Sequence, residues 1–222
     1  MDVQKLMDVY EVQNIASAYV HNLNSRKKKE IVYECFTQHT PGQKVQITDW
    51  GVWEGEKAAE RLFLGFMNDN APEKPVTMGR HELTSPYIIV AEDSRTAVGV
   101  WDAPGWETAH YYDHWIGGDF TSDTLAAWWS WGAYWMAFQK EPEGWRIWQL
   151  KFLSAINCDM LSSYVKSNSS PRERVNWDLR PKETWPDRPG YDWIYHPEGT
   201  PMPDRMPLPK PYKTWTDDMS QI

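Results

Sequence analysis

The stretch that decides the fold is Thr124-Leu-Ala-Ala-Trp-Trp-Ser-Trp-Gly-Ala-Tyr-Trp-Met-Ala-Phe138. After the turn Glu141-Pro-Glu-Gly144, it is followed by Trp145-Arg-Ile-Trp-Gln-Leu-Lys-Phe152. Two aromatic-rich runs that flank a short Gly-containing turn favour a β-hairpin. One face of this hairpin would be crowded with indole rings, so we expect it to be the wall against which the rest of the chain packs.

The composition is that of a soluble protein with an excess of tryptophan. The chain has 222 residues, of which 41% are hydrophobic, 24% are charged and 15 are tryptophan. This length suits one full core with an appendage. The net charge is −8, whereas nucleic acids and anionic membranes are normally met by a basic stripe. We therefore expect neither partner, and the run Arg26-Lys-Lys-Lys29 is interpreted as a solvated helix start.

The cysteines and the N-terminal residues predict a cytoplasmic protein. Cys35 lies in a helical pattern and Cys158 follows the last predicted strand, so a disulfide framework is not expected. The run Met1-Asp-Val-Gln-Lys-Leu6 lacks the charged-then-apolar pattern of a signal peptide. No segment approaches the roughly 18 apolar residues of a membrane span.

Before the hairpin, a helical period gives way to a strand period. Apolar residues such as Leu6, Tyr10 and Tyr19 recur at helical spacing in the first segment. The predicted elements are helices over 3–23, 25–36 and 55–67, a strand over 43–49, and strands over 81–90 and 96–103, the last of which 108–115 could prolong. Consecutive strands joined by hairpins imply an antiparallel sheet with helices on one face, which is an α+β fold.

The chain changes character after the hairpin. We expect residues 1–155 to form the core domain and residues 156–222 to form an extension. The extension contains a short predicted helix over 159–166 and then many prolines without a period, which makes independent folding unexpected. Four tryptophans in it are unusual for a disordered tail: Trp177, Trp185, Trp193 and Trp215. We expect an extended arm that lays its indoles on the core or on a neighbouring subunit.

Four features together resemble a known family. They are Tyr19 near the end of the first helix, the segment Gly51-Val-Trp-Glu-Gly55 before the third helix, the strand that begins at His81, and the segment Gly144-Trp-Arg-Ile147 of the last strand. This order is similar to the SnoaL-like branch of the nuclear-transport-factor-2-like superfamily, which includes ketosteroid isomerase, scytalone dehydratase and bile acid dehydratase. The resemblance covers about residues 5–155. It implies a curved sheet wrapped around helices into a cone, a deep apolar pocket, a homo-oligomer such as a dimer or trimer, and no cofactor.

The resemblance also implies a set of catalytic residues. In dehydratase-like members a tyrosine of the first helix, a histidine of the following strand and an acidic residue of the next strand share the pocket. Tyr19 and His81 match the first two, and Asp102 is the candidate for the third. Asn24 stands where these members often have an aspartate after the tyrosine, which removes one carboxylate.

The residue chemistry leaves two interpretations open for each candidate. An imidazole can exchange protons near neutral pH, so His81 is the best acid or base, although it could equally be a satisfied core histidine. Tyr19 could bind a substrate oxygen or a backbone carbonyl. If Trp145 and Ile147 point inward, strict alternation sends Gln149 and Lys151 inward too. A buried Lys151 would have a lowered pKa and could act as a base, whereas a Lys151 at the mouth would pair with a carboxylate.

Aromatic side chains are the candidate pocket lining, because indoles stack on flat rings. The alternative is that many of them fill the core and anchor the arm. The predicted substrate-binding residues are Asn24, Trp53, Trp101, His110, Tyr112, Trp129, Trp131, Trp135 and Gln149.

A metal site is not expected. His110, Tyr112 and His114 share one parity around Asp113, but alternate residues of one strand do not easily converge on one ion. The chain has no Gly-rich phosphate loop, Gly-x-Ser-x-Gly elbow or cysteine nucleophile motif.

Three functional hypotheses follow from the sequence. The first is a cofactor-independent lyase or isomerase that acts on a hydrophobic, aromatic or polycyclic molecule, with His81 or Lys151 as the base, Tyr19 as a hydrogen-bond donor and Asp102 as the group that orients the base. The second is a binding or dimerisation module of the same fold. The third is a metal-assisted hydrolase that uses His110 and His114.

Overall fold

The computed structural model describes residues 3–67, 78–110, 125–168, 170–175, 177–199 and 206–222. Within these ranges, no helix is both long and apolar enough to cross a membrane. Cys35 and Cys158 are both buried and both are thiols.

The helices lie on one side of the sheet. α1 (Val3–Asn24) buries Val12, Ala16, Tyr19 and Val20, a spacing that repeats one helical face. α2 (Lys28–Glu30) continues as π-helical turns over Ile31–Cys35, and α3 (Ala58–Glu60) continues in the same way over Arg61–Phe66. These faces form one core with the concave side of the sheet.

Over the described residues, the sheet has eight strands and is mixed. Its main path runs β2-β1-β8-β7-β5-β4, and β6 pairs with both β7 and β3. The strands are β1 (Lys44–Ile47), β2 (Gly51–Glu54), β3 (Gly79–His81), β4 (Thr84–Val90), β5 (Thr96–Ala103), β6 (Gly105–His110), β7 (Leu125–Glu141) and β8 (Gly144–Asp159).

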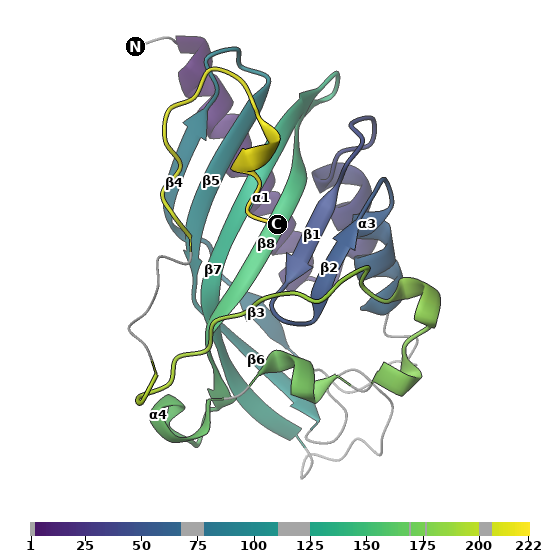
Figure 1. Cartoon of the computed structure of the whole chain (residues 1–222), viewed down its shortest axis with the longest axis vertical. Coiled ribbons are helices and arrows are strands. Elements are labelled where there is room, and N and C mark those ends of the chain that lie inside the picture. Colours follow the sequence, from purple (N-terminus) through teal and green to yellow (C-terminus); the bar gives the residue numbers. More distant parts are fainter. Residues whose placement is uncertain (1–2, 68–77, 111–124, 169, 176, 200–205) are drawn as a thin grey trace.

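The predicted α+β architecture with a curved sheet and N-terminal helices is confirmed, with differences in the strands. Residues 81–90, expected to form one strand, are divided between β3, which pairs with β6, and β4, which pairs with β5. β1 pairs parallel with β8, whereas the other strand pairs of the described residues are antiparallel. Residues 51–54, between the strand predicted over 43–49 and the helix predicted over 55–67, form strand β2. The two long strands β7 and β8 run through the middle of the molecule, with α1 behind them (Figure 1).

A bulge in β8 decides which residues face the core. Ala137 registers with Gln149, but Phe138 registers with Ile147, so Trp148 is an extra residue. One extra residue reverses the alternation of side chains along a strand. Ile147 therefore faces the helices, whereas Gln149 faces the other side, which we call the outer face. The side that packs on the helices is called the inner face.

The C-terminal arm packs on the core of its own chain. It contains α4 (Tyr164–Ser167) and short 3₁₀ turns at Pro171–Arg174, Trp177–Leu179, Lys182–Thr184 and Asp217–Met219. Its first part lies along the helices and β2, where the Trp53 indole donates to the carbonyl of Thr184 (2.7 Å) and Arg61 pairs with Asp187 (3.0 Å). Its last part crosses in front of β5 and β7 (yellow in Figure 1).

The last part of the arm, 206–222, covers the upper outer face. A second hydrophobic cluster there joins Val98, Val100, Trp135 and Ala137 of the sheet to residues of the arm. The arm contributes Met206, Tyr212, Trp215, Met219 and Ile222. The sheet is thus packed on both faces, by helices on one side and by an irregular strap on the other.

Candidate functional site

A histidine and a glutamate meet on the inner face. His81, the last residue of β3, registers with Gly105 of β6, and Glu107 lies two residues further along β6, on the same face. The His81 Nε2 atom lies 3.1 Å from Glu107 Oε1, and the two side chains are 11% and 20% exposed. A mostly buried acid–base pair is therefore built into the curved end of the sheet.

Two tyrosine hydroxyls lie on the same face. Tyr19 of α1 and Tyr134 of β7 are fully buried, their rings pack edge to face at 5.9 Å, and their hydroxyls share a hydrogen bond. Burial raises the pKa of both phenols, and the charge of nearby Glu107 raises the pKa of Tyr134 further. Both phenols therefore stay protonated at neutral pH and can donate hydrogen bonds.

Phe152 of β8 joins the histidine to the tyrosines. Its ring lies 5.4 Å from that of His81 and 4.7 Å from that of Tyr134. Gly132 makes room for this ring, because a Cβ at Gly132 would lie 2.8 Å from Phe152 and 2.1 Å from the carbonyl oxygen of Leu153. The glycine in the Trp-rich run thus leaves space for the Phe152 ring beside His81 and Tyr134.

Asn24 fixes the main chain of His81. Its side-chain oxygen accepts from the His81 N–H and its amide donates to the His81 carbonyl, both at 2.8 Å. A carboxylate could make only the first of these bonds. The structure therefore shows Asn24 as a clamp on the strand, and the carboxylate near His81 comes from Glu107.

Asp102 lies on the outer face. It registers with Ala133 on β5 and β7, and its side chain is exposed. The expectation that it orients His81 is not supported, because the chain breaks at Pro104 and starts a new strand, β6, that brings Glu107 to the histidine. A glutamate with strand-like neighbours, in Gly105-Trp-Glu-Thr-Ala109, was the signal in the sequence.

Lys151 and Gln149 also lie on the outer face, so their expected inward orientation is wrong. The Lys151 Nζ donates to the carbonyl of Gln221 at 2.7 Å, and Gln149 Oε1 accepts from the hydroxyl of Ser220 at 2.7 Å. Burial lowers the pKa of Lys151, as predicted for a desolvated amine, but the burial comes from the arm.

The tryptophans of the hairpin divide between the two faces. Trp129, Trp131 and Trp135 have outer-face parity, and Trp131 is 42% exposed. Trp128 registers with Glu107 and shares the inner face with it. Along β7, the alternate residues that include Trp128 and Tyr134 face inward. The β7 tryptophans predicted to bind substrate, Trp129, Trp131 and Trp135, belong to the set that faces outward.

Of the remaining predicted substrate-binding residues, two are buried in the core and the side chains of the others lie outside the described part of the structure. Trp53 is fully buried against Phe66 and the arm. Trp101 is buried on the inner face beside Tyr134, with its indole N–H bonded to Gln13 at 3.1 Å. Tyr112 and His114 lie outside the described residues, and the side chain of His110 is not described.

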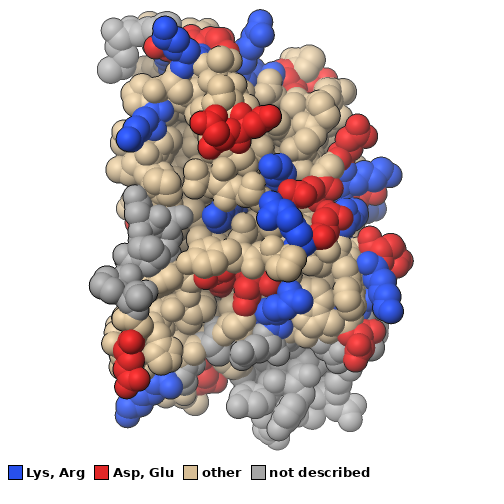
Figure 2. All heavy atoms as spheres, in the orientation of Figure 1, with Lys and Arg blue, Asp and Glu red and all other residues tan. Residues whose placement is uncertain are grey.

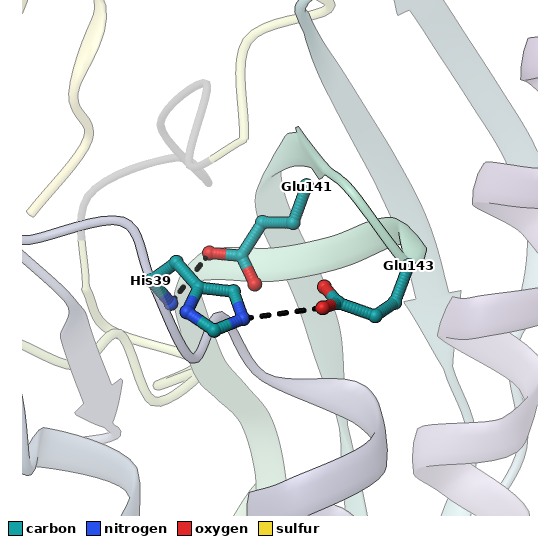
Figure 3. A group of neighbouring side chains, drawn as sticks. All are labelled: His39, Glu141 and Glu143. Atoms are coloured by element: carbon teal, nitrogen blue, oxygen red, sulfur yellow. Dashed lines mark hydrogen bonds and ion pairs between the residues drawn. The ribbon is translucent and has the colours of Figure 1, made fainter.

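One further group of side chains has metal-ligand chemistry. Ligand atoms of His39, Glu141 and Glu143 lie within 4.8 Å of one another (Figure 3). The buried carboxylate of Glu141, however, accepts the backbone N–H groups of Gln38, His39 and Thr40 at 2.8–2.9 Å and the Thr40 hydroxyl at 2.8 Å. Burial opposes ionisation, but these bonds hold the Glu141 pKa below its usual value. Glu141 thus clamps a loop to the hairpin turn.

The charge distribution shows no basic stripe on the visible face. Acidic and basic side chains are interspersed on the face that the arm crosses (Figure 2).

The fold and site define a class of small α+β proteins in which a curved sheet wraps N-terminal helices and carries acid–base residues on its inner face. The chain belongs to the SnoaL-like domain family, whose profile matches residues 4–151. The family prediction is confirmed, and the arm lies outside the match. None of the curated proteins matches in sequence.

Solved structures show the same fold. A candidate dehydratase of the NTF2-like family from Streptomyces avermitilis superposes with a TM-score of 0.53 at 15% identity, covering 68% of this chain and 98% of its own. A candidate scytalone dehydratase from Novosphingobium aromaticivorans has a TM-score of 0.53 at 11% identity, covering 79% and 100%. The hexachlorocyclohexane dehydrochlorinase LinA-type3 from Novosphingobium barchaimii has a TM-score of 0.53 at 12% identity, covering 73% and 97%.

Proposed function

We propose that this protein is a cofactor-independent lyase or isomerase that moves a proton on a hydrophobic, aromatic or polycyclic small molecule. The observation that carries the proposal is the His81–Glu107 pair, 3.1 Å apart and mostly buried. A paired imidazole and carboxylate in a desolvated place is typical of general acid–base catalysis.

The surroundings of the pair support the substrate class. Trp128, Tyr134 and Phe152 share the inner face with Glu107, and Trp101 lies beside Tyr134. Aromatic walls with few polar groups suit flat, apolar ligands. The tyrosine hydroxyls could steady an oxygen that gains charge during the reaction.

The similar structures favour an elimination. A dehydratase removes water and a dehydrochlorinase removes hydrogen chloride, and each requires a proton to leave carbon while a neighbouring group departs. These names describe the relatives; for this chain, loss of a small leaving group is the form of the reaction that we propose first.

A binding module is the second candidate. Tyr19 and Tyr134 are almost fully buried and bonded to each other, as expected of side chains that only support a ligand site. The same fold would then hold a ligand without converting it.

The experiment is an assay of the purified protein with hydroxylated aromatic dimers, steroids, polyketide-like ketones and chlorinated cyclic hydrocarbons, followed by mass spectrometry. We expect a product that has lost water or hydrogen chloride or has the mass of the substrate with a shifted double bond. Quenching of tryptophan fluorescence by a compound that remains unchanged would favour the binding module and contradict catalysis.

We also propose a homodimer and a cytoplasmic location, on the basis of the family and the composition. Light scattering of the eluting protein tests the dimer, and a mass of about 26 kDa, that of one chain, would contradict it. Cell fractionation tests the location.

A further inference from the structure

The imidazole of His81 has neither nitrogen available for a substrate. Nε2 is engaged by Glu107. Nδ1 is buried and has no hydrogen-bond partner among the described residues. It lies against the main chain of β6, since a Cβ on Gly105 would be only 3.0 Å away.

This packing selects one form of the histidine. In either neutral tautomer the buried Nδ1 has no hydrogen-bond partner among the described residues, so the contact of Nε2 decides between them. A proton on Nδ1 would leave the lone pair of Nε2 facing the Glu107 carboxylate, whereas a proton on Nε2 is donated to that carboxylate. The two bonds from Asn24 and the edge of Phe152 hold the ring in place.

Glu107 is the better placed member of the pair for contact with a ligand. It is 20% exposed, against 11% for His81. It faces Trp128 across the strand pair and lies close to Tyr134. The Glu107 carboxylate therefore lies among the side chains that would contact a ligand, whereas the His81 imidazole is the more buried of the two groups.

We infer that Glu107 is the catalytic base and that His81 is a positioning residue that holds it through Nε2–H. This inference rests on the proposed function and reverses the roles expected from the sequence. The carboxylate takes a proton from a substrate carbon, and the C–H electron pair becomes the new double bond. For loss of water, the departing hydroxide takes this proton from Glu107. For isomerisation, Glu107 returns the proton to another carbon. In both reactions Glu107 is again a carboxylate when the product is formed.

The pH dependence follows from this assignment. Activity is lost as pH falls and Glu107 is protonated. The titratable groups around it include His81 from β3, Tyr134 from β7 and, through Tyr134, Tyr19 from α1. The tyrosines remain protonated, so an acidic limb can come from His81 or Glu107, and the limb of a variant without the imidazole reports the carboxylate. This limb should persist when the imidazole is removed.

The test compares Glu107→Gln with His81→Gln on the panel compound that is turned over fastest, with the exposed Glu34→Gln as the matched control. Glutamine at position 81 can place its amide N–H where Nε2–H was. We expect kcat to fall roughly 10²–10⁴-fold for Glu107→Gln, in the range of general acid–base catalysis. His81→Gln should lose no more than about tenfold and keep its acidic limb. An equal loss in both variants, or activity within tenfold in Glu107→Gln, would overturn the inference.

A measurement without substrate separates this inference from the proposed function. Nitrogen NMR of the neutral His81 ring should show Nε2 protonated and Nδ1 unprotonated, and a change at Nε2 in Glu107→Gln. The opposite tautomer would overturn the inference. Absence of turnover by the unmodified protein would count against the proposed function, whereas turnover that survives Glu107→Gln would count against Glu107 as the base.

Discussion

The polar side chains on the two faces of the sheet have different kinds of partner. On the inner face, polar side chains bind one another: His81 pairs with Glu107, and Tyr19 with Tyr134. On the outer face, polar side chains bind the arm instead, as Lys151 does with the carbonyl of Gln221. The inner pattern joins groups that can exchange or share protons. The outer pattern joins side chains of the sheet to polar groups of the arm, the Gln221 carbonyl and the Ser220 hydroxyl, and so attaches the arm to the sheet.

The difference shows that burial by itself does not mark a catalytic residue in this protein. Lys151 and Glu107 are both ionisable and both partly buried. Lys151 is buried by an irregular strap from the same chain, whereas Glu107 is buried in the concave side of the sheet beside a histidine. The partner of each group, rather than its exposure, separates the two roles.

The largest effect that we predict is on the outer face. Trp135 is 2% exposed and packs against Trp215 of the arm. Trp135→Ala should lower the free energy of unfolding by about 3–5 kcal/mol, as large-to-small changes at buried aromatics do. Activity per folded molecule should be retained. Urea unfolding measures the loss, with the more exposed Trp131→Ala as the control. A large drop in kcat without loss of stability would break the distinction between the faces.

Much of the fold could be predicted because it depends on local patterns. The helical period of residues 3–23 gave α1 with Tyr19 on its buried face, and the Trp-rich run gave the β7–β8 hairpin. Strand β2 was missed because a glycine between a predicted strand and a predicted helix, here Gly51, favours a turn. The face of the hairpin could not be predicted, because the bulge at Trp148 adds one residue, and a single residue reverses every later side chain.

Part of the candidate site could be named from the sequence. His81 and Tyr19 lie on the inner face, where the order of elements places them, and their catalytic roles stay predictions. Glu107 and Tyr134 were missed because their roles depend on which strands pair: β6 had to separate from β5 at Pro104 to bring Glu107 beside β3. The arm was expected to dock, but its sequence has no period that would show where.

The second prediction concerns the docking of the arm. Asp192 accepts from the N–H groups of Ser154 and Trp193, at 2.7 and 2.9 Å. Burial, with a contribution from nearby Asp49, raises its pKa from 3.8 to about 7. The folded state therefore binds this proton more tightly, so stability from this group is fully present below about pH 4 and is lost as pH rises through 7. Between pH 5 and 8 the loss is roughly 2–3 kcal/mol.

Urea unfolding at several pH values tests this prediction, with Asp192→Asn as the comparison. The variant should show a smaller fall in stability between pH 5 and 8, because it has no carboxyl to titrate. The exposed Asp178→Asn in the same arm serves as the control. Equal pH dependence of the variant and the parent protein would contradict a titrating Asp192.

The third prediction concerns the inner face. Tyr134→Phe removes one of the paired hydroxyls beside Glu107 but keeps the ring. We expect kcat to fall about 10–100-fold, as for loss of a hydrogen-bond donor to developing charge, and stability to change by about 1 kcal/mol. The half-exposed Tyr33→Phe is the control. Full activity in Tyr134→Phe would show that the hydroxyl pair is structural and would favour the binding module.

The smallest effect is expected at Lys151, where the sequence and the structure disagree most clearly. Lys151→Met removes the bond to the Gln221 carbonyl but also removes the cost of burying a charge, which is the cause of the lowered pKa. These terms oppose each other, so the free energy of unfolding should change by no more than about 1 kcal/mol. Since Lys151 faces the arm, kcat/KM should stay within about twofold of the parent value. Loss of activity with unchanged stability would mean that the outer face takes part in the reaction, and the assignment of catalysis to the inner face would then be wrong.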